Sequence, residues 1–179
     1  MAMSGDKRAV FLDKDGTLVE NVPYNVNPER IALAPGAVEA VRRLAEHGYR
    51  IIVVSNQPGV ALGYFALADL RGVEQRLDQL LPALDGFYFC PHAPEDGCSC
   101  RKPACGMLVR AAQEHAVDLQ NSWMVGDILD DIEAGRRAGC RTVLVDNGNE
   151  TEWDLSAARR PHGRVTGLAE AASLICGTT

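Results

Sequence analysis

Two aspartates near the N-terminus have a spacing that could support phosphate-ester chemistry. Asp13 and Asp15 flank a single lysine, directly after the apolar run of residues 9–12, and are followed by Gly16 and Thr17. A carboxylate can attack phosphorus as a nucleophile, and a second one can protonate the leaving oxygen and then activate water. Residues 13–17 therefore predict a nucleophile, Asp13, with its acid/base partner, Asp15.

Three cysteines and a histidine crowd into residues 90–100, immediately before Arg101 and Lys102. Three thiolates and one imidazole suit a closed tetrahedral zinc site. Two other interpretations remain open, a redox pair at Cys98 and Cys100 and a surface loop of reduced thiols. A zinc ion here would fix the position of Arg101 and Lys102. The four predicted zinc ligands are Cys90, His92, Cys98 and Cys100.

A carboxylate that attacks a phosphate monoester needs positive charge nearby, because two anions repel each other. Lys102 could supply part of that charge, Ser55 could donate a hydrogen bond to a phosphoryl oxygen, and Mg²⁺ held by carboxylates such as Asp127 could supply the rest. Each residue also has an ordinary alternative role. Paired acids in loops are usually solvated, Asp127 could cap the helix that follows it, and Lys102 could be a surface charge. Their order beside successive strand ends favours one site.

Apolar runs alternate with helical periodicities along the whole chain. The runs are apolar on both faces, which predicts an α/β fold, a Rossmann-like parallel sheet with helices on both sides. Such sheets bind ligands at the carboxyl ends of their strands, where Asp13, Ser55 and Asp127 are expected. Strands are expected at residues 9–12, 50–54, 86–89, 122–125, 142–145 and 164–166, and helices near 38–45, 67–80, 107–115, 132–138 and 168–175.

Length and composition limit the class of protein. The chain has 179 residues, which fits a single domain spanning residues 1–179. A net charge of −6 without a basic block argues against a nucleic-acid partner. No apolar run is long enough to cross a membrane, and no secretion leader is apparent, so a cytoplasmic monomer with a small-molecule substrate is expected.

The motifs resemble those of the haloacid dehalogenase superfamily of phosphatases, from residue 10 to about residue 145. More narrowly, the chain is similar to the D-glycero-D-manno-heptose-1,7-bisphosphate 7-phosphatases. Cys-Pro-His at residues 90–92 and Cys-Ser-Cys-Arg-Lys-Pro at residues 98–103 are the specific elements. Residues 11–17, 55–59 and 124–127 carry the rest of the resemblance.

The resemblance implies roles for individual residues. Asp13 would be the nucleophile and Asp15 the acid/base, while Ser55 and Lys102 would stabilise the transferring phosphoryl group. Mg²⁺ would be held by Asp13, the backbone carbonyl of Asp15, and Asp127. The residues implied in substrate binding are Asn21, Tyr24, Asn56, Gln57 and Arg101.

Four further positions near the motifs either support the site or differ from the family pattern. Asp130 and Asp131 are expected to support the metal ligands or to place charge at a helix N-terminus, rather than to bind the metal. Ile128 follows Asp127 where the family usually carries lysine, which removes a positive charge beside the metal. Cys105 stands where a proline is common.

The implied activity is Mg²⁺-dependent removal of the 7-phosphate of D-glycero-D-manno-heptose 1,7-bisphosphate through an aspartyl-phosphate. Histidinol-phosphate phosphatase, built from the same motifs, is the nearest alternative. A non-catalytic zinc-binding interaction module is an alternative from a different class. Residues 15–50 and 81–102 are too short to hold the family's cap domains, so the site is expected to be open.

Overall fold

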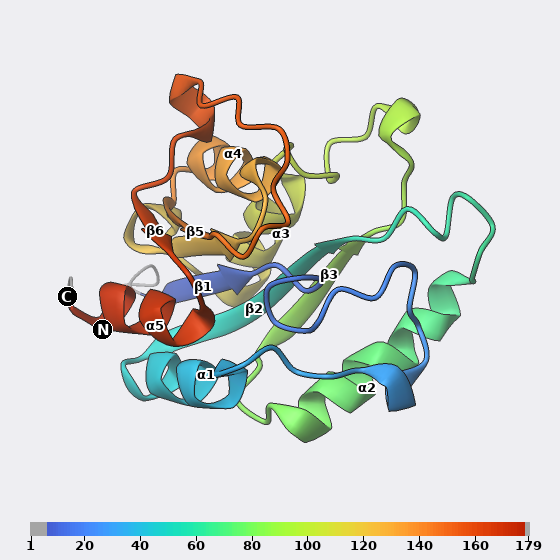
Figure 1. The fold of residues 1–179 in the computed structure, drawn as a ribbon, viewed down its shortest axis with the longest axis horizontal. Helices are drawn as coiled ribbons and strands as arrows, with labels where there is room; N and C mark the ends of the chain where they lie inside the picture. The colour runs from blue at the N-terminus through green and yellow to red at the C-terminus, as the bar shows by residue number, and fades with distance from the viewer. Residues whose placement is uncertain (1–6, 178–179) are drawn as a thin grey trace.

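The computed structural model describes residues 7–177, so the two ends of the expected 1–179 domain lie outside the described part. Six parallel strands form one sheet in the order β3-β2-β1-β4-β5-β6 (Figure 1). The predicted doubly covered parallel sheet is therefore confirmed. The strands are β1 (Arg8–Leu12), β2 (Tyr49–Asn56), β3 (Gly86–Cys90), β4 (Trp123–Gly126), β5 (Arg141–Val145) and β6 (Gly163–Val165).

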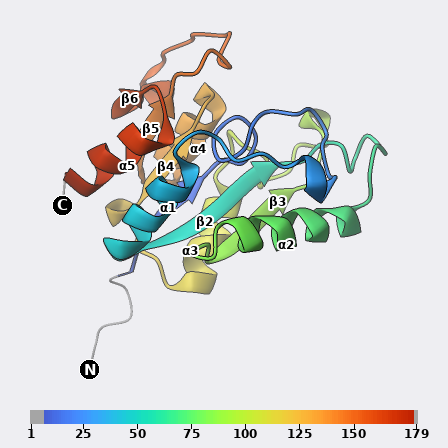
Figure 2. The same ribbon diagram turned by 60° about the horizontal axis from the view of Figure 1, so that its bottom comes forward.

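Helices cover both faces of this sheet, which explains why its strands are apolar on both sides. On one face α1 (Ala37–Glu46), α2 (Leu70–Leu80) and α5 (Leu168–Gly177) bury their apolar side chains, and Figure 2 brings these three helices forward. On the other face α3 (Gly106–His115) and α4 (Leu129–Ala138) pack against alternate residues of the same strands. Burial of these alternate side chains fixes the register of each strand against its neighbour.

The helix boundaries differ from the sequence prediction at two places. Residues 67–69 form a 3-10 turn ahead of α2 rather than its first turn. Helix α4 begins at Leu129, three residues before the predicted start. The prediction relied on the apolar repeat, and the first turn of α4 is acidic rather than apolar, so the repeat does not include it. In that turn the Asp131 carboxylate accepts a hydrogen bond from the backbone N–H of Ile128 (3.2 Å) and so satisfies a donor that the helix leaves unpaired.

Three loops gather at the carboxyl ends of β1, β2 and β3 (Figure 1). Among the described residues, the segments 13–36, 57–66 and 91–105 contain only loops, isolated bridges and short 3-10 turns, so no cap domain is inserted there. Within residues 7–177, no helix is long and apolar enough to cross a bilayer. The loops and the strand ends together position the candidate site.

Candidate active site

A cavity of about 300 Å³ opens at the carboxyl ends of the strands. It brings together most of the site residues predicted from the sequence, although these lie on different strands and loops. Gln57 and Tyr24 are absent from its lining. The lining residues are Asp13, Asp15, Asn21, Ser55, Asn56, Pro58, Arg101, Lys102, Asp127, Ile128, Asp130, Asp131 and Asn149.

Three buried carboxylates converge at the floor of this cavity. One oxygen each of Asp13, Asp127 and Asp131 lies within 4.8 Å of the other two. Burial, and then the neighbouring charges, raise the pKa of Asp13 to about 7, with Lys102 opposing the rise. Burial and the charge of Asp13 raise the pKa of Asp127 to about 7 as well. A cluster of mutually repelling carboxylate oxygens is a donor set that suits a hard divalent cation such as Mg²⁺.

Asp131 lies within this cluster. It was expected to support the metal ligands or to place charge at a helix N-terminus, and its fully buried carboxylate lies beside Asp13 and Asp127 in the first turn of α4. Gly126 makes room for it, because a Cβ at that position would lie 2.2 Å from Asp131 Oδ2. Asp130 also lines the cavity, and its carboxylate pairs with Arg159.

Lys102 supplies a buried positive charge beside the carboxylates. Its Nζ lies 2.5 Å from Asp13 Oδ1 and 2.7 Å from Asp131 Oδ1, and it donates to the Val54 carbonyl at 3.0 Å. Burial lowers the pKa of this ammonium, but the charges of Asp13 and Asp131 outweigh burial and raise the pKa above its ordinary value. Lys102 is therefore held protonated next to the predicted nucleophile.

The backbone at Lys102 is held by Asn56 at the end of β2. The Asn56 side chain accepts a hydrogen bond from the Lys102 N–H and donates one to the Lys102 carbonyl, both at 3.0 Å. Asn56 was predicted to contact substrate, and it does line the cavity. The structure adds a positioning contact to that prediction, because this amide joins the β2 end to the segment that carries Lys102.

The cysteine segment folds into a compact cluster directly before Lys102. Its four predicted ligand atoms lie together, with Sγ–Sγ separations of 3.1–3.6 Å and His92 Nδ1 at 3.2 and 3.5 Å from two of the sulfurs. These separations exceed a disulfide bond and are slightly shorter than the edges of about 3.8 Å in a tetrahedron with Zn–S bonds of 2.3 Å. The donor set and its arrangement fit one Zn²⁺.

The thiols of this cluster differ in their proton affinity. Burial raises the pKa of Cys90 to about 12. Burial also tends to raise the pKa of Cys98, but the backbone N–H of Arg101 and other hydrogen bonds lower it to about 6. Without a cation the thiols would not all be ionised at neutral pH, so a bound metal would have to displace protons from them.

Both carboxylate oxygens of Asp15 have protein partners. Lys14, which is itself buried, lies 2.5 Å from one oxygen, and the Gln57 amide nitrogen donates to the other at 3.0 Å. The same nitrogen donates to Ser55 Oγ at 2.9 Å. Gln57 is buried and links the predicted acid/base to the predicted phosphate-binding serine. Its amide nitrogen contacts protein groups, and its implied contact with substrate stays a prediction.

Asp127 is held by two neutral donors that sequence reasoning did not assign to it. Thr17 Oγ1 donates to Oδ1 at 3.1 Å, and Asn149 Nδ2 donates to Oδ2 at 2.7 Å. Thr17 belongs to the first motif and was expected only to support its loop. Asn149 follows β5, and no local pattern in the sequence indicates that it reaches Asp127.

The loop that contains Asn21 and Tyr24 places one of these residues in the cavity lining and the other at the protein surface. Asn21 lines the cavity, as predicted for a substrate contact. Tyr24 is 51% exposed and packs edge-on against the exposed ring of Tyr64, with ring centroids 4.8 Å apart. If Tyr24 contacts substrate as predicted, the contact would take place outside the lining of the cavity, at the surface loop that holds Tyr24 and Tyr64.

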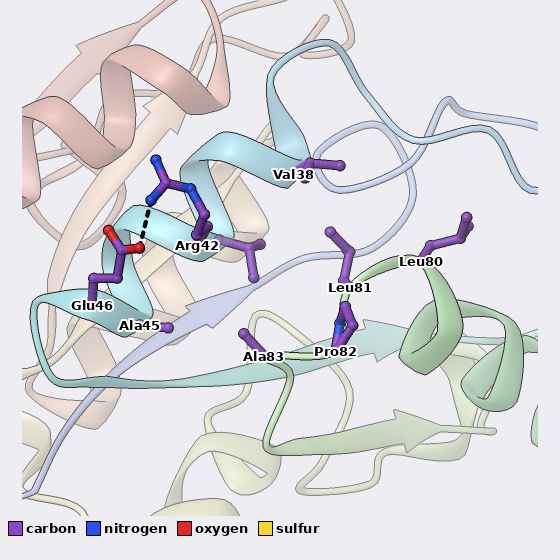
Figure 3. Close-up of a pocket in the computed structure, with 9 residues that line it drawn as sticks. Val38, Arg42, Ala45, Glu46, Leu80, Leu81, Pro82 and Ala83 are labelled. Atoms are coloured by element: carbon purple, nitrogen blue, oxygen red, sulfur yellow. Dashed lines mark hydrogen bonds and ion pairs between the residues drawn. The ribbon is translucent and has the colours of Figure 1, made fainter.

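A second cavity, of about 450 Å³, lies between α1 and the segment that follows α2 (Figure 3). The side chains of Val38, Leu80 and Leu81 face it, and its two charged residues, Arg42 and Glu46, pair with each other at 2.5 Å. Its lining lacks the clustered titratable groups of the strand-end cavity, which remains the candidate active site.

Comparison with known proteins agrees with this geometry. A family model described as HAD-hydrolase-like matches residues 99–171. A D-glycero-D-manno-heptose-1,7-bisphosphate 7-phosphatase of Thermosynechococcus vestitus is 40% identical over 186 aligned positions, which cover 94% of this chain and 95% of the relative. The chain is a phosphatase of the HAD family. The non-catalytic interpretation is thereby set aside.

Two further relatives support the assignment of the chain to the HAD phosphatases. The D-glycero-beta-D-manno-heptose-1,7-bisphosphate 7-phosphatase of Pseudomonas aeruginosa is 38% identical over 144 residues, which cover 78% of this chain and 81% of the relative. The crystal structure of the D,D-heptose 1,7-bisphosphate phosphatase of B. bronchiseptica superposes with a TM-score of 0.83 and 30% identity, covering 96% and 99% of the two chains. That crystal structure is described as a complex with magnesium and phosphate.

Proposed function

We propose that this phosphatase removes the 7-phosphate of D-glycero-D-manno-heptose 1,7-bisphosphate, with Mg²⁺ as cofactor and an aspartyl-phosphate as intermediate. One observation carries the mechanism, the buried contact of Lys102 with Asp13 at the floor of a cavity that also holds Asp15, Asp127 and Asp131. The substrate is supported by relatives that bear this name and cover most of the chain. We also propose that the whole chain acts as one catalytic domain and works as a monomer.

The first half-reaction forms a bond between an Asp13 oxygen and phosphorus and breaks the bond from phosphorus to the sugar oxygen. Asp15 donates its proton to the departing sugar oxygen. In the second half-reaction Asp15 takes a proton from water and the water oxygen bonds to phosphorus. The bond between phosphorus and the Asp13 oxygen breaks, which releases inorganic phosphate and regenerates Asp13. Mg²⁺, held by Asp13, the Asp15 carbonyl and Asp127, would neutralise phosphate charge during both steps.

Lys102 compensates charge as the reaction proceeds. Its ammonium makes three contacts in the structure, to Asp13, Asp131 and the Val54 carbonyl. When the Asp13 oxygen bonds to phosphorus, its negative charge passes to the phosphoryl oxygens. The hydrogen bond that Lys102 gives to Asp13 can then move to one of these oxygens, with Ser55 Oγ as a second donor.

The rest of the substrate would lie toward the loops that surround the cavity. Arg101 lines the cavity and is half-buried, with its guanidinium donating to the His92 carbonyl at 3.4 Å, so it is placed to meet an anionic or hydroxylated group. Asn21 would contact the sugar from the opposite loop, and Tyr24 from the rim. Ile128 lines the cavity next to Asp127, where it presents an apolar surface in place of a charge.

Zinc bound to Cys90, His92, Cys98 and Cys100 would have a structural role. Cys98→Ser should release the metal, so we expect zinc content to fall from about one per chain to near zero. The melting temperature should fall by roughly 10 °C, the shift that about 3 kcal/mol produces in a chain of this size. Metal analysis by mass spectrometry and a thermal melt measure the two effects.

Cys105→Ser is the matched control, since Cys105 lies five positions beyond the last cluster residue and outside the cluster. That variant should keep its zinc and its melting temperature. A wild-type protein that is purified without chelators and contains no zinc would contradict the structural zinc site, whatever the stability of Cys98→Ser.

The substrate is tested by steady-state hydrolysis of D-glycero-D-manno-heptose 1,7-bisphosphate and histidinol phosphate under identical conditions. We expect kcat/KM for the heptose bisphosphate to exceed that for histidinol phosphate by at least about 100-fold, the discrimination that roughly 3 kcal/mol of differential binding supplies. A preference for histidinol phosphate would overturn the substrate assignment and leave the phosphatase mechanism in place. Chelating magnesium before the assay should abolish phosphate release from either substrate.

A further inference from the structure

The loop after β5 contacts both the segment after β1 and the segment after β4, which carry the candidate metal ligands Asp13 and Asp127. Asn147 Nδ2 donates to the Gly16 carbonyl at 2.6 Å, and Glu150 accepts a hydrogen bond from the Leu129 N–H, also at 2.6 Å. Between them Asn149 Nδ2 donates to Asp127 Oδ2 at 2.7 Å. Gly148, with φ of +90°, lets the chain turn sharply between Asn147 and Asn149. Three contacts thus attach one loop to the segment after β1, to the residue after β4 and to the start of α4.

The hydrogen bond from Asn149 to Asp127 is packed against backbone. A Cβ built on Gly16 would lie 2.3 Å from Asp127 Oδ2 and 2.6 Å from Asn149 Nδ2. The hydrogen bond therefore runs directly over Gly16, and a side chain at this position would collide with both of its atoms. Thr17 Oγ1 donates to the other oxygen of Asp127 at 3.1 Å, so the two bonds together hold both carboxylate oxygens.

The donor's chemistry suits a carboxylate that has to bind a cation. Asn149 is neutral, so it orients Asp127 without cancelling the negative charge that attracts a metal. The ammonium of Lys102 contacts the other two members of the cluster, Asp13 and Asp131. Amide donors that orient a ligating carboxylate are the interactions that tune metal affinity from outside the ligand set.

We propose that Asn149 is a positioning residue that orients Asp127 for Mg²⁺ and so sets the affinity of the site for the ion. This inference rests on the proposed function, in which Asp127 holds the metal. Asn149 does not transfer protons or bind phosphorus in this role. Its effect reaches the reaction through the occupancy of the metal site.

The test is calorimetric titration of MgCl₂ into the full chain, dialysed into magnesium-free buffer. We expect Asn149→Ala to weaken Mg²⁺ binding about tenfold, the lower end of the range for losing such a partner. Asn121→Ala is the matched control, because Asn121 Nδ2 donates to Asp118 Oδ2 at the same 2.7 Å on an exposed 3-10 turn outside the cavity. The control should bind Mg²⁺ as the wild type does.

A second measurement separates positioning from substrate contact. If Asn149 acts through the metal, kcat of Asn149→Ala should return to within about twofold of the wild type at saturating Mg²⁺, while half-maximal activity needs about tenfold more of the ion. Persistent loss of kcat at saturating Mg²⁺ with unchanged Mg²⁺ affinity would overturn the proposal.

Asp127→Asn distinguishes failure of this inference from failure of the proposed function. If Asp127→Asn binds Mg²⁺ poorly and Asn149→Ala binds it as the wild type does, the positioning role of Asn149 is wrong and the metal assignment stands. If Asp127→Asn binds Mg²⁺ as the wild type does, Asp127 does not hold the metal, and both proposals fall.

Discussion

Asp13→Asn should lower kcat for phosphate release by at least about 10⁴-fold, because the amide cannot form the covalent bond to phosphorus on which both half-reactions depend. The fold should persist. Asp13 is buried, and burial raises the pKa of its carboxyl, which favours the neutral form, so an amide of the same shape should be tolerated there. Lys102 would keep Asp131 and the Val54 carbonyl as partners. Steady-state phosphate release and a thermal melt measure activity and stability in the same preparation.

The matched control for this prediction is Asp78→Asn, the same chemical change at an exposed position on α2. It should leave both kcat and the melting temperature unchanged. Turnover by Asp13→Asn within tenfold of the wild type would exclude Asp13 as the nucleophile. Loss of the folded state in Asp13→Asn would instead contradict the tolerance inferred from its raised pKa.

Lys102→Met should abolish turnover and also destabilise the protein. Removing the ammonium leaves Asp13 and Asp131 buried without their cation, and breaking one partner out of such a buried pair costs about 3–5 kcal/mol. The catalytic loss should be at least about 10³-fold, the effect of removing a preorganised charge from the transition state. Lys7→Met, at an exposed lysine before β1, is the control and should change neither property.

A double variant separates the two roles of Lys102. In Lys102→Met combined with Asp131→Asn, one of the two stranded carboxylates is gone, so about half of the lost stability should return. Activity should not return, because the phosphoryl group still lacks its cation. Recovery of turnover together with stability would show that Lys102 only balances the charge of Asp131, and would contradict its role in phosphoryl transfer.

The family and the fold class were predictable from local patterns in the sequence. Apolar runs mark the strands β1 to β5, while β6 is a short Gly-Arg-Val strand without such a run. The Cys-Pro-His and Cys-Ser-Cys-Arg-Lys-Pro segments narrow the superfamily to the heptose phosphatase relatives that the comparisons found. The placement of Asp13 and Asp127 follows from the same logic, since a polar residue after a buried parallel strand lies at the carboxyl edge of the sheet. These features are encoded within a few residues of one another.

The partners of the site residues were less predictable. Asn56 and Gln57 were assigned to substrate by resemblance, yet their amides bond to the Lys102 backbone and to Asp15 and Ser55. Asp131 was expected to support the metal ligands or to place charge at a helix N-terminus, and its contact with Lys102 was not part of that prediction. A polar side chain of ordinary type carries no sign of which distant group it will meet.

Strand periodicity and motif spacing are local, so they were enough to predict the reactive residues and the edge of the sheet at which these residues lie. Tertiary structure decided which of them touch. Lys102 meets Asp131 across the cavity floor, and Asn149 reaches Asp127 from the loop after β5, only because the cysteine segment and that loop fold back onto the strand ends. Such contacts depend on the paths of loops between strands, and no periodicity in the chain specifies where a loop returns.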